Sequence, residues 1–349
     1  MKILLVDGIS GVSLGRDIFN SMQANGVSCH YISTSKDLPQ KSLVKVKGAF
    51  AKLKDKAVSG RDFYYYPKAV ASAFADAIEE CDPDIVFVVG FLYRAVDLNL
   101  VANLKKTKKT KFVLYDTDSC NLFPYQREFT YFIREELPLY DKVFSFSKVT
   151  SEFYAKVLGL DAVYAPFGSN PIPVPSQLPA KDIDVLFVGS ADMRRVFLLE
   201  KLTDFKLAIY GSRWDRHEPL MSDRLKSKVS RQAVWGGELY GLFHRSKVIL
   251  NITRGTFYGV ETGVNLRIPE TLSANGFLLT DHTDELGSQY VVGETLESYR
   301  SSEELVEKVS TYLQNDVARA KIADQGHECW KHNYTWDVCV KRMLAVLQA

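Results

Sequence analysis

A proline-rich segment in the middle of the chain constrains the fold most strongly. Residues 166–181 have the sequence PFGSNPIPVPSQLPAK, with five prolines. Proline lacks a main-chain donor and disrupts helix interiors and central strands, so neither element fits here. A chain of 349 residues is also too long for one compact core. We therefore expect two domains joined by an extended, rather stiff linker at 171–181.

Short apolar runs alternate with helical patterns on both sides of this linker. The expected strands are 2–7, 84–89, 111–115, 142–146, 161–164, 183–188, 205–210, 247–252 and 276–280. The expected helices are 14–25, 66–80, 95–105, 125–137, 148–158, 192–203, 269–275, 302–314, 316–331 and 335–348. Such alternation is typical of parallel sheets covered on both faces. It predicts an α/β protein with Rossmann-like domains at 1–170 and 182–333, followed by a final segment at 334–349.

The composition is that of an ordinary soluble protein. Hydrophobic residues make up 46% and charged residues 25%, and the net charge of +2 does not imply a nucleic-acid partner. Five cysteines without a C-x-x-C pair indicate reduced thiols and a cytoplasmic protein. The apolar run at the N-terminus is too short for a signal peptide, and no stretch approaches membrane-spanning length. Any membrane association, for example at the inner membrane face, would be peripheral.

One basic segment interrupts the first domain. Residues 41–56 alternate lysines with Leu, Val and Phe. We favour a solvated amphipathic helix or loop, and the alternative is docking onto an anionic acceptor or a membrane surface. The lysine run at 105–111 is interpreted as a solvated loop.

The strongest candidate site is the segment 265–276, NLRIPETLSANG. Pro269 suits the first position of a helix, so Asn265 and Arg267 would lie just before its N-terminus and Glu270 in its first turn. Free N–H groups and the helix dipole at that end suit a phosphate. Arg267 could bind a phosphate oxygen and Glu270 a ribose diol, although glutamate in a first turn stabilises any helix.

Two further segments follow predicted strands, where ligands bind in open parallel sheets. In the first, Gly189 and Ser190 precede Arg194 and Arg195, and two arginines at a helix start suggest an anionic partner. The alternative is that they point to solvent. The second segment combines a glycine, a cation and an aromatic ring, and further polar and aromatic residues are expected near it. An aromatic or apolar slot there could hold a nucleobase, and the alternative is that the rings pack in the core. The residues concerned are Gly211, Arg213, Trp214, Tyr240, Asn251 and Arg254.

In the first domain, Asp116 and Asp118 end a predicted strand. One of them could act as general base on an acceptor hydroxyl, and the alternatives are a weak D-x-D metal motif or Asx-turn chemistry. The loop with Gly8, Ser10 and Gly11 should face the same cleft. The histidines lack metal-binding spacing, so we assign no metal site, and no G-x-S-x-G elbow indicates a hydrolase.

The motifs FVGS at 187–190, IYGSRW at 209–214 and GVNLRIPETLSANGFLLTD at 263–281 resemble those of group-1 glycosyltransferases, specifically the CgeB-like, spore-maturation-type branch. The resemblance covers about residues 183–345. It implies a GT-B fold, with two Rossmann-like domains facing across a cleft and a last helix crossing back to the first domain. The C-terminal domain would bind a nucleotide-sugar, with UDP expected, and the N-terminal domain an acceptor glycan, lipid-linked glycan or protein.

The resemblance also implies roles for individual residues. Glu270 would bind the ribose, and Arg267 with Arg194 or Arg195 the diphosphate. The usual Glu-x7-Glu spacing is not met, because eight residues separate Glu261 from Glu270. No permanently bound cofactor or obligatory metal is expected.

A weaker likeness to phage DNA β-glucosyltransferases makes Asp118 or Asp116 the candidate base and leaves a modified-DNA acceptor open. The same architecture is also compatible with a nucleotide-sugar epimerase or phosphorylase, or with a non-catalytic spore-coat or surface-assembly protein.

Overall fold

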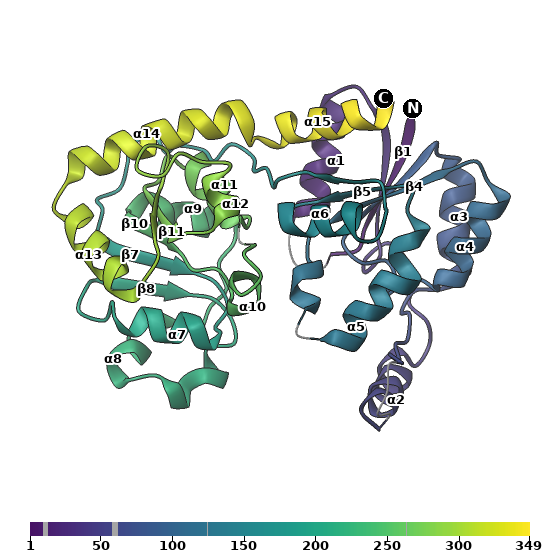
Figure 1. Cartoon of the computed structure of the whole chain (residues 1–349), viewed down its shortest axis with the longest axis horizontal. Helices are drawn as coiled ribbons and strands as arrows, with labels where there is room; N and C mark the ends of the chain where they lie inside the picture. Colours follow the sequence, from purple (N-terminus) through teal and green to yellow (C-terminus); the bar gives the residue numbers. More distant parts are fainter. Residues whose placement is uncertain (10–12, 58–61, 124, 263) are drawn as a thin grey trace. The chain divides into compact units, whose positions relative to one another are not determined.

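The computed structural model of the chain describes residues 1–9, 13–57, 62–123, 125–262 and 264–349. The chain forms two compact units. Unit 1 comprises Met1–Pro166 with Val340–Ala349, and unit 2 comprises Phe167–Cys339. Each unit contains a parallel sheet with helices packed around it (Figure 1). Each unit has the Rossmann-like α/β architecture that the sequence predicts.

The sheet of unit 1 has six parallel strands in the order β2-β1-β3-β4-β5-β6. The predicted strands are confirmed as β1 (Lys2–Asp7), β3 (Ile85–Val89), β4 (Lys111–Asp116), β5 (Lys142–Ser145) and β6 (Ala162–Tyr164). Strand β2 (Ser28–Ser33) was not predicted, because its sequence SCHYIS mixes polar and apolar residues at the sheet edge. By contrast, β3 has the sequence IVFVV and is buried throughout, as expected for a central strand.

The helices of unit 1 are α1 (Leu14–Ala24), α2 (Val44–Ala57), α3 (Ala71–Cys81), α4 (Leu98–Thr107), α5 (Gln126–Tyr131) and α6 (Lys148–Lys156). The helix predicted at 125–137 changes after α5 to a π-helical turn, Phe132–Glu136. The buried Glu136 carboxylate accepts hydrogen bonds from the N–H groups of Leu92 and Tyr93, at 2.9 and 2.7 Å, and from the Tyr140 hydroxyl at 2.8 Å. It therefore fixes the main chain just beyond β3.

Glu136 should make the stability of unit 1 depend on pH. Burial raises the pKa of this carboxyl from 4.5 to about 7, although its hydrogen bonds oppose the shift. Because the folded state binds the proton more tightly, this contribution to stability is full below pH 4.5 and is lost as pH rises through about 7. We expect a loss of about 2–3 kcal/mol across that window. Denaturant unfolding of wild type and Glu136→Gln at several pH values checks this. If the free energies of unfolding of the two proteins change in parallel with pH, the prediction is contradicted.

The sheet of unit 2 also has six parallel strands, in the order β12-β11-β10-β7-β8-β9. The predicted strands are β7 (Ile183–Val188), β8 (Leu207–Tyr210), β10 (Ser246–Asn251) and β11 (Leu278–Asp281), and the short edge strands β9 (Val229–Ser230) and β12 (Glu297–Tyr299) were not predicted. The chain runs outward in one direction from β7 and in the other from β10. These neighbouring strands therefore flank the point where the strand order reverses, beside which Rossmann-type sheets bind ligands.

The helices that follow the strands of unit 2 are α7 (Met193–Glu200), α8 (Asp223–Lys226), α9 (Gly236–Arg245), α10 (Gly255–Tyr258), α11 (Arg267–Ser273), α12 (Asp284–Gly287), α13 (Ser302–Leu313) and α14 (Asp316–Asn333). The last helix, α15 (Trp336–Gln348), begins in unit 2, and its residues from Val340 onward group with unit 1. Residues 170–182 form neither helix nor strand, as their prolines predict. No helix in the described ranges is both long enough and apolar enough to cross a membrane.

Candidate nucleotide-binding site

The loops that follow β7 and β10 in unit 2 are tied together by one buried arginine. Arg195 donates from Nε and Nη2 to the Ile252 carbonyl, at 2.9 and 2.7 Å, and from Nη1 to the Ser190 carbonyl at 2.7 Å. Burial lowers the pKa of this guanidinium to about 10. Asp192 accepts the Arg195 N–H at 2.9 Å and so caps α7. The sequence predicts a phosphate contact for Arg195, but the structure assigns its donors to positioning these loops.

Arg194, the preceding residue of α7, contacts the same loop after β10. Its Nη1 donates to the Thr253 carbonyl at 2.9 Å and lies 3.3 Å from Asp281 Oδ1, and its guanidinium lies 3.9 Å from the centre of the Tyr258 ring. The buried Asp281 also accepts the Thr253 N–H at 2.7 Å. Much of the Arg194 charge is therefore balanced within the protein, which the sequence did not reveal.

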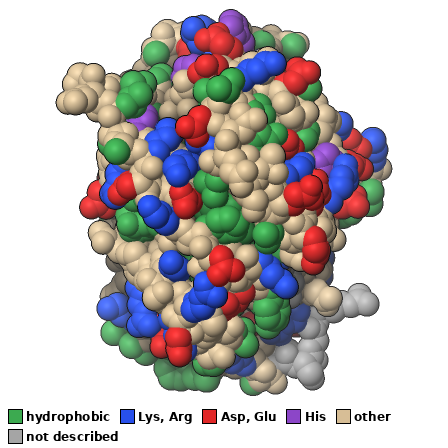
Figure 2. All heavy atoms as spheres, turned by 90° about the vertical axis from the view of Figure 1, so that its left-hand side faces the viewer, with side chains coloured by type: hydrophobic (Ala, Val, Ile, Leu, Met, Phe, Trp, Pro, Cys, Tyr) green, Lys and Arg blue, Asp and Glu red, His purple; other side chains and the backbone are tan. Residues whose placement is uncertain are grey.

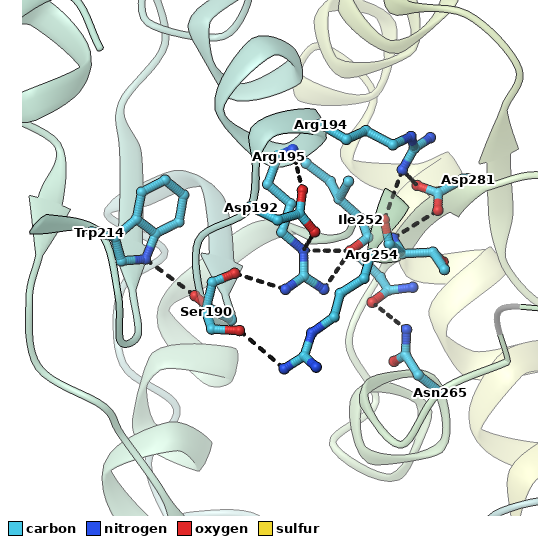
Figure 3. A network of polar contacts seen from close by, with 12 residues as sticks. Ser190, Asp192, Arg194, Arg195, Trp214, Ile252, Arg254, Asn265 and Asp281 are labelled. Atoms are coloured by element: carbon cyan, nitrogen blue, oxygen red, sulfur yellow. Dashed lines mark hydrogen bonds and ion pairs between the residues drawn. The ribbon is translucent and has the colours of Figure 1, made fainter. Parts of the chain in front are cut away.

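Arg254, Ser190 and Asn265 bring polar side chains from three loops to the carboxyl ends of β7 and β10. Arg254 follows β10, and its Nη2 donates to the Ser190 hydroxyl at 3.1 Å. Figure 3 shows the Arg254 side chain extending toward Ser190. Asn265 donates to Asn251 Oδ1 at 3.1 Å, and the buried Asn251 donates to Thr280 Oγ1 at 2.8 Å. These side chains supply both hydrogen-bond donors and positive charge at the strand-order reversal.

The segment around Arg267 differs from expectation in its helix boundary. Helix α11 begins at Arg267, so Pro269 is its third residue rather than its first. Asn265 Oδ1 accepts the Arg267 N–H at 3.0 Å, which starts the helix early and occupies one of its free amides. The helix has only seven residues. One main-chain amide of the expected phosphate site is therefore already engaged by a side chain.

Arg267 and Glu270 form a close ion pair on α11. Arg267 Nη1 lies 2.6 Å from Glu270 Oε2, with the two side chains 14% and 20% exposed. The Arg267 guanidinium lies 5.5 Å from the centre of the Phe243 ring. Its Nε is buried without a hydrogen-bond partner among the described residues. The Arg267 guanidinium thus makes an ion pair through Nη1 and keeps one unsatisfied donor, Nε.

The aromatic slot expected near Trp214 is core packing. Trp214 is 1% exposed, packs edge-on against Phe187 and donates from Nε1 to the Gly189 carbonyl at 3.1 Å. Tyr240 is half-buried against the apolar cluster under α9. Arg213, which precedes Trp214, is exposed and has a positive φ of 66°. The Trp214 ring is thus covered by protein, in agreement with the core-packing alternative.

Gly211 is the residue that lets the β7 and β8 loops approach each other. Its φ is +147°, and a Cβ built there would overlap the Gly189 carbonyl. At Gly189 a Cβ would lie 3.0 Å from the Phe187 ring and 3.3 Å from Arg195 Nη1. The glycines predicted at this site thus serve close main-chain packing.

In unit 1, the two predicted carboxylates occupy different environments. Asp116 is 1% exposed, accepts the Ser119 N–H at 2.9 Å and the Tyr154 hydroxyl at 3.3 Å, and burial raises its pKa. Asp116 therefore organises the loop after β4 and is not accessible to an acceptor, which corrects its candidacy as base. Asp118 is half-buried and accepts a hydrogen bond from Asn121 Nδ2.

The remaining predicted residues of unit 1 follow β1 in the sequence. Gly8 follows β1, and a Cβ there would lie 2.7 Å from the Phe91 carbonyl oxygen. Ser10 and Gly11 fall outside the described residues. Across the described ranges, no group of three or more His, Cys, Asp or Glu side chains is arranged to hold a metal ion.

Comparison with known proteins supports the GT-B architecture. Residues 194–345 match the model of a family described as glycosyl transferase-like. Sucrose-phosphate synthase from Thermosynechococcus elongatus is 13% identical with a TM-score of 0.68, and the match covers 100% of this chain and 98% of that one. Anabaena Alr3699/HepE, solved with UDP-glucose, is 11% identical with a TM-score of 0.66, covering 100% and 99%.

An α-glucosyltransferase solved with UDP is 12% identical with a TM-score of 0.63, covering 100% of both chains. At such identities these similarities establish the fold, which is that of GT-B glycosyltransferases. No curated protein sequence matches the chain significantly.

Proposed function

We propose that this chain is a glycosyltransferase that moves a sugar from a nucleotide-sugar, UDP-sugar in the first instance, to an acceptor hydroxyl. The observation that carries this proposal is the gathering of Arg254, Ser190 and Asn265 where the strand order of unit 2 reverses. Ligands bind at this position in Rossmann-type sheets. The glycosyl transferase-like family match and the structural neighbours solved with UDP support the same function.

In this proposal the donor diphosphate binds to the side chains of Arg254 and Arg267. A guanidinium can form paired, charge-assisted hydrogen bonds to phosphate oxygens. Glu270 would bind the ribose, as the resemblance to the CgeB-like branch implies. The Arg267 side chain is 14% exposed, so part of its guanidinium is accessible to a phosphate. Arg195 and Arg194 act indirectly, by holding the loops that carry Ser190 and Arg254.

Such fixed cations would stabilise the transition state. As the bond from the anomeric carbon to the leaving oxygen breaks, negative charge develops on the diphosphate. Guanidinium groups held in place before the reaction stabilise that charge without reorganising. They therefore lower the barrier more than they strengthen ground-state binding.

We assign acceptor binding to unit 1 and the role of general base to Asp118. Asp118 follows β4, at the carboxyl end of the sheet, and is more accessible than Asp116. The proposed acceptors are hydroxyls of a glycan, a lipid-linked glycan or a protein. No disulfide joins the five cysteines, all of which lie in the described ranges, and this supports a reducing, cytoplasmic setting.

Replacing Arg254 by alanine should weaken UDP binding more than tenfold. A charge-assisted hydrogen bond contributes about 1.5–3 kcal/mol, and 1.4 kcal/mol corresponds to a factor of ten. Calorimetric titration of UDP, with GDP and dTDP for comparison, measures the effect. Arg245→Ala is the matched control, because Arg245 forms an exposed ion pair with Asp182 at the end of α9. Equal UDP affinity of wild type and Arg254→Ala contradicts the assignment.

A further inference from the structure

Helix α2 leaves most of its large apolar residues exposed. None of its described residues is buried, and Val46, Phe50 and Leu53 are 50%, 67% and 63% exposed. Helix α1 of the same unit instead buries Ile18 and Met22 completely. A surface helix of a globular protein normally turns its apolar stripe toward the core. Packing within unit 1 therefore does not explain why the apolar stripe of α2 is exposed.

The orientation of α2 places this stripe away from the protein. Residues 44, 48, 51 and 55 are half-buried, whereas residues 46, 50, 53 and 57 are exposed. Both sets follow a four-three-four spacing, and at about 100° per residue they lie on opposite sides of the helix. Asp55, on the inner side, fixes this orientation through an ion pair with Arg127 at 2.8 Å. Arg127 Nη2 also donates to the Asp55 carbonyl at 2.6 Å.

Two rows of lysine flank the exposed apolar stripe. The helical spacing places Lys45, Lys52 and Lys56 on one flank and Lys47 and Lys54 on the other. Lys54 Nζ lies 3.8 Å from the centre of the Tyr64 ring. Among the described residues, none of the five lysines forms an ion pair with a carboxylate. The single acid of the helix is Asp55, so α2 carries five positive charges against one negative charge.

The surface of unit 2 provides a contrast. There Arg245 pairs with Asp182 at 2.6 Å and Lys247 with Asp184 at 2.8 Å. Figure 2 shows a face on which Lys and Arg side chains stand among Asp and Glu side chains. In unit 1, α2 lies apart from the strands of its sheet (Figure 1). The positive charge of α2 is thus locally unbalanced and coincides with exposed apolar surface.

We propose that α2 binds the surface of an anionic lipid bilayer. Val46, Phe50 and Leu53 would enter the boundary between headgroups and acyl chains, and the flanking lysines would contact lipid phosphates. A basic, amphipathic helix with an aromatic residue in its apolar stripe has the chemistry for this position. A nucleic acid would engage the lysines without using the apolar stripe. The proposal does not depend on sugar transfer by unit 2.

Vesicle cosedimentation with the full chain tests the proposal. We expect binding to phosphatidylcholine vesicles that contain phosphatidylglycerol, little binding to phosphatidylcholine alone, and weakening by added salt. The double variants Phe50→Ser/Leu53→Ser and Lys45→Gln/Lys52→Gln should each weaken the binding more than tenfold. The matched control is Lys106→Gln/Lys109→Gln, which removes two exposed lysines, one in the last turn of α4 and one just beyond it, and should change binding less than twofold.

Three outcomes overturn the proposal. They are absence of binding to the anionic vesicles, unchanged vesicle binding in Phe50→Ser/Leu53→Ser, and an equal loss in the Lys106/Lys109 control. Short duplex DNA serves as a further probe. If Lys45→Gln/Lys52→Gln weakens DNA binding while Phe50→Ser/Leu53→Ser leaves vesicle binding unchanged, α2 is a nucleic-acid surface instead. Thermal unfolding confirms that each variant is folded. UDP titration is a separate readout, so failure of vesicle binding is distinguishable from failure of the proposed transfer function.

Discussion

Replacing Gly211 by alanine should destabilise unit 2 by about 3 kcal/mol or more, because two penalties act at once. The backbone there has a φ of +147°, which side chains other than glycine rarely adopt. The added Cβ would also overlap the Gly189 carbonyl, which is main chain and cannot rotate away. Gly189 in turn accepts the Trp214 indole N–H and precedes Ser190, so the change would displace the proposed donor site as well.

All four tryptophans of the chain lie in unit 2, so their fluorescence during denaturant unfolding measures this loss. Gly241→Ala is the matched control. Gly241 lies within α9, and a Cβ there meets no described atom within 4 Å. Alanine should therefore stabilise the helix slightly, by about 0.5–1 kcal/mol. Equal stability of Gly211→Ala and wild type would refute the close packing of the β7 and β8 loops.

Asp118→Asn should reduce sugar transfer by about 100-fold or more while leaving UDP affinity unchanged. Loss of a positioned general base typically costs about 10²–10⁴-fold in rate. Asparagine preserves the size of the side chain, so an effect confined to turnover indicates proton transfer. Product formation from UDP-sugar and a panel of hydroxyl acceptors provides the rate.

Asp97→Asn is the control for this experiment. Asp97 caps α4 in the same unit by accepting the Asn99 N–H at 2.9 Å, and asparagine caps helices equally well. This variant should keep full activity. Full transfer activity in Asp118→Asn would exclude Asp118 as the base, and the assignment of unit 1 to the acceptor would lose its only named residue.

The sequence predicts the architecture well because hydrophobic periodicity carries most of the information. Strand β3 is a continuous apolar run that follows helix α3, and β7 is apolar except for Asp184; runs of this kind have few other solutions. The missed strands β2, β9 and β12 are edge strands, and β9 and β12 have only two and three residues. Their pairing depends on neighbouring strands, which a local pattern does not reveal.

The site is less predictable, because the same residue type can bind a ligand or the main chain. Both Arg195 and Arg254 lie just after a strand, so their positions in the sequence do not show which one binds the main chain. In the structure Arg195 binds the Ile252 carbonyl, whereas Arg254 donates to the Ser190 hydroxyl. The predicted start of α11 is two residues late: the helix begins at Arg267, whose N–H donates to Asn265 Oδ1, a contact that the preference of Pro269 for the first position did not reveal. Asp281 was missed, although its place at the end of a strand is a signal that could have identified it.

Amide hydrogen exchange with and without UDP-glucose tests the central claim most directly. With the donor bound, as established by titration on the same sample, we expect slower exchange at Ser190–Arg195, at Thr253–Gly255 and at Asn265–Ile268, the segments that meet at the strand-order reversal of unit 2. If UDP-glucose binds while exchange in all three segments stays unchanged, the donor occupies another part of the protein and the proposed site is wrong.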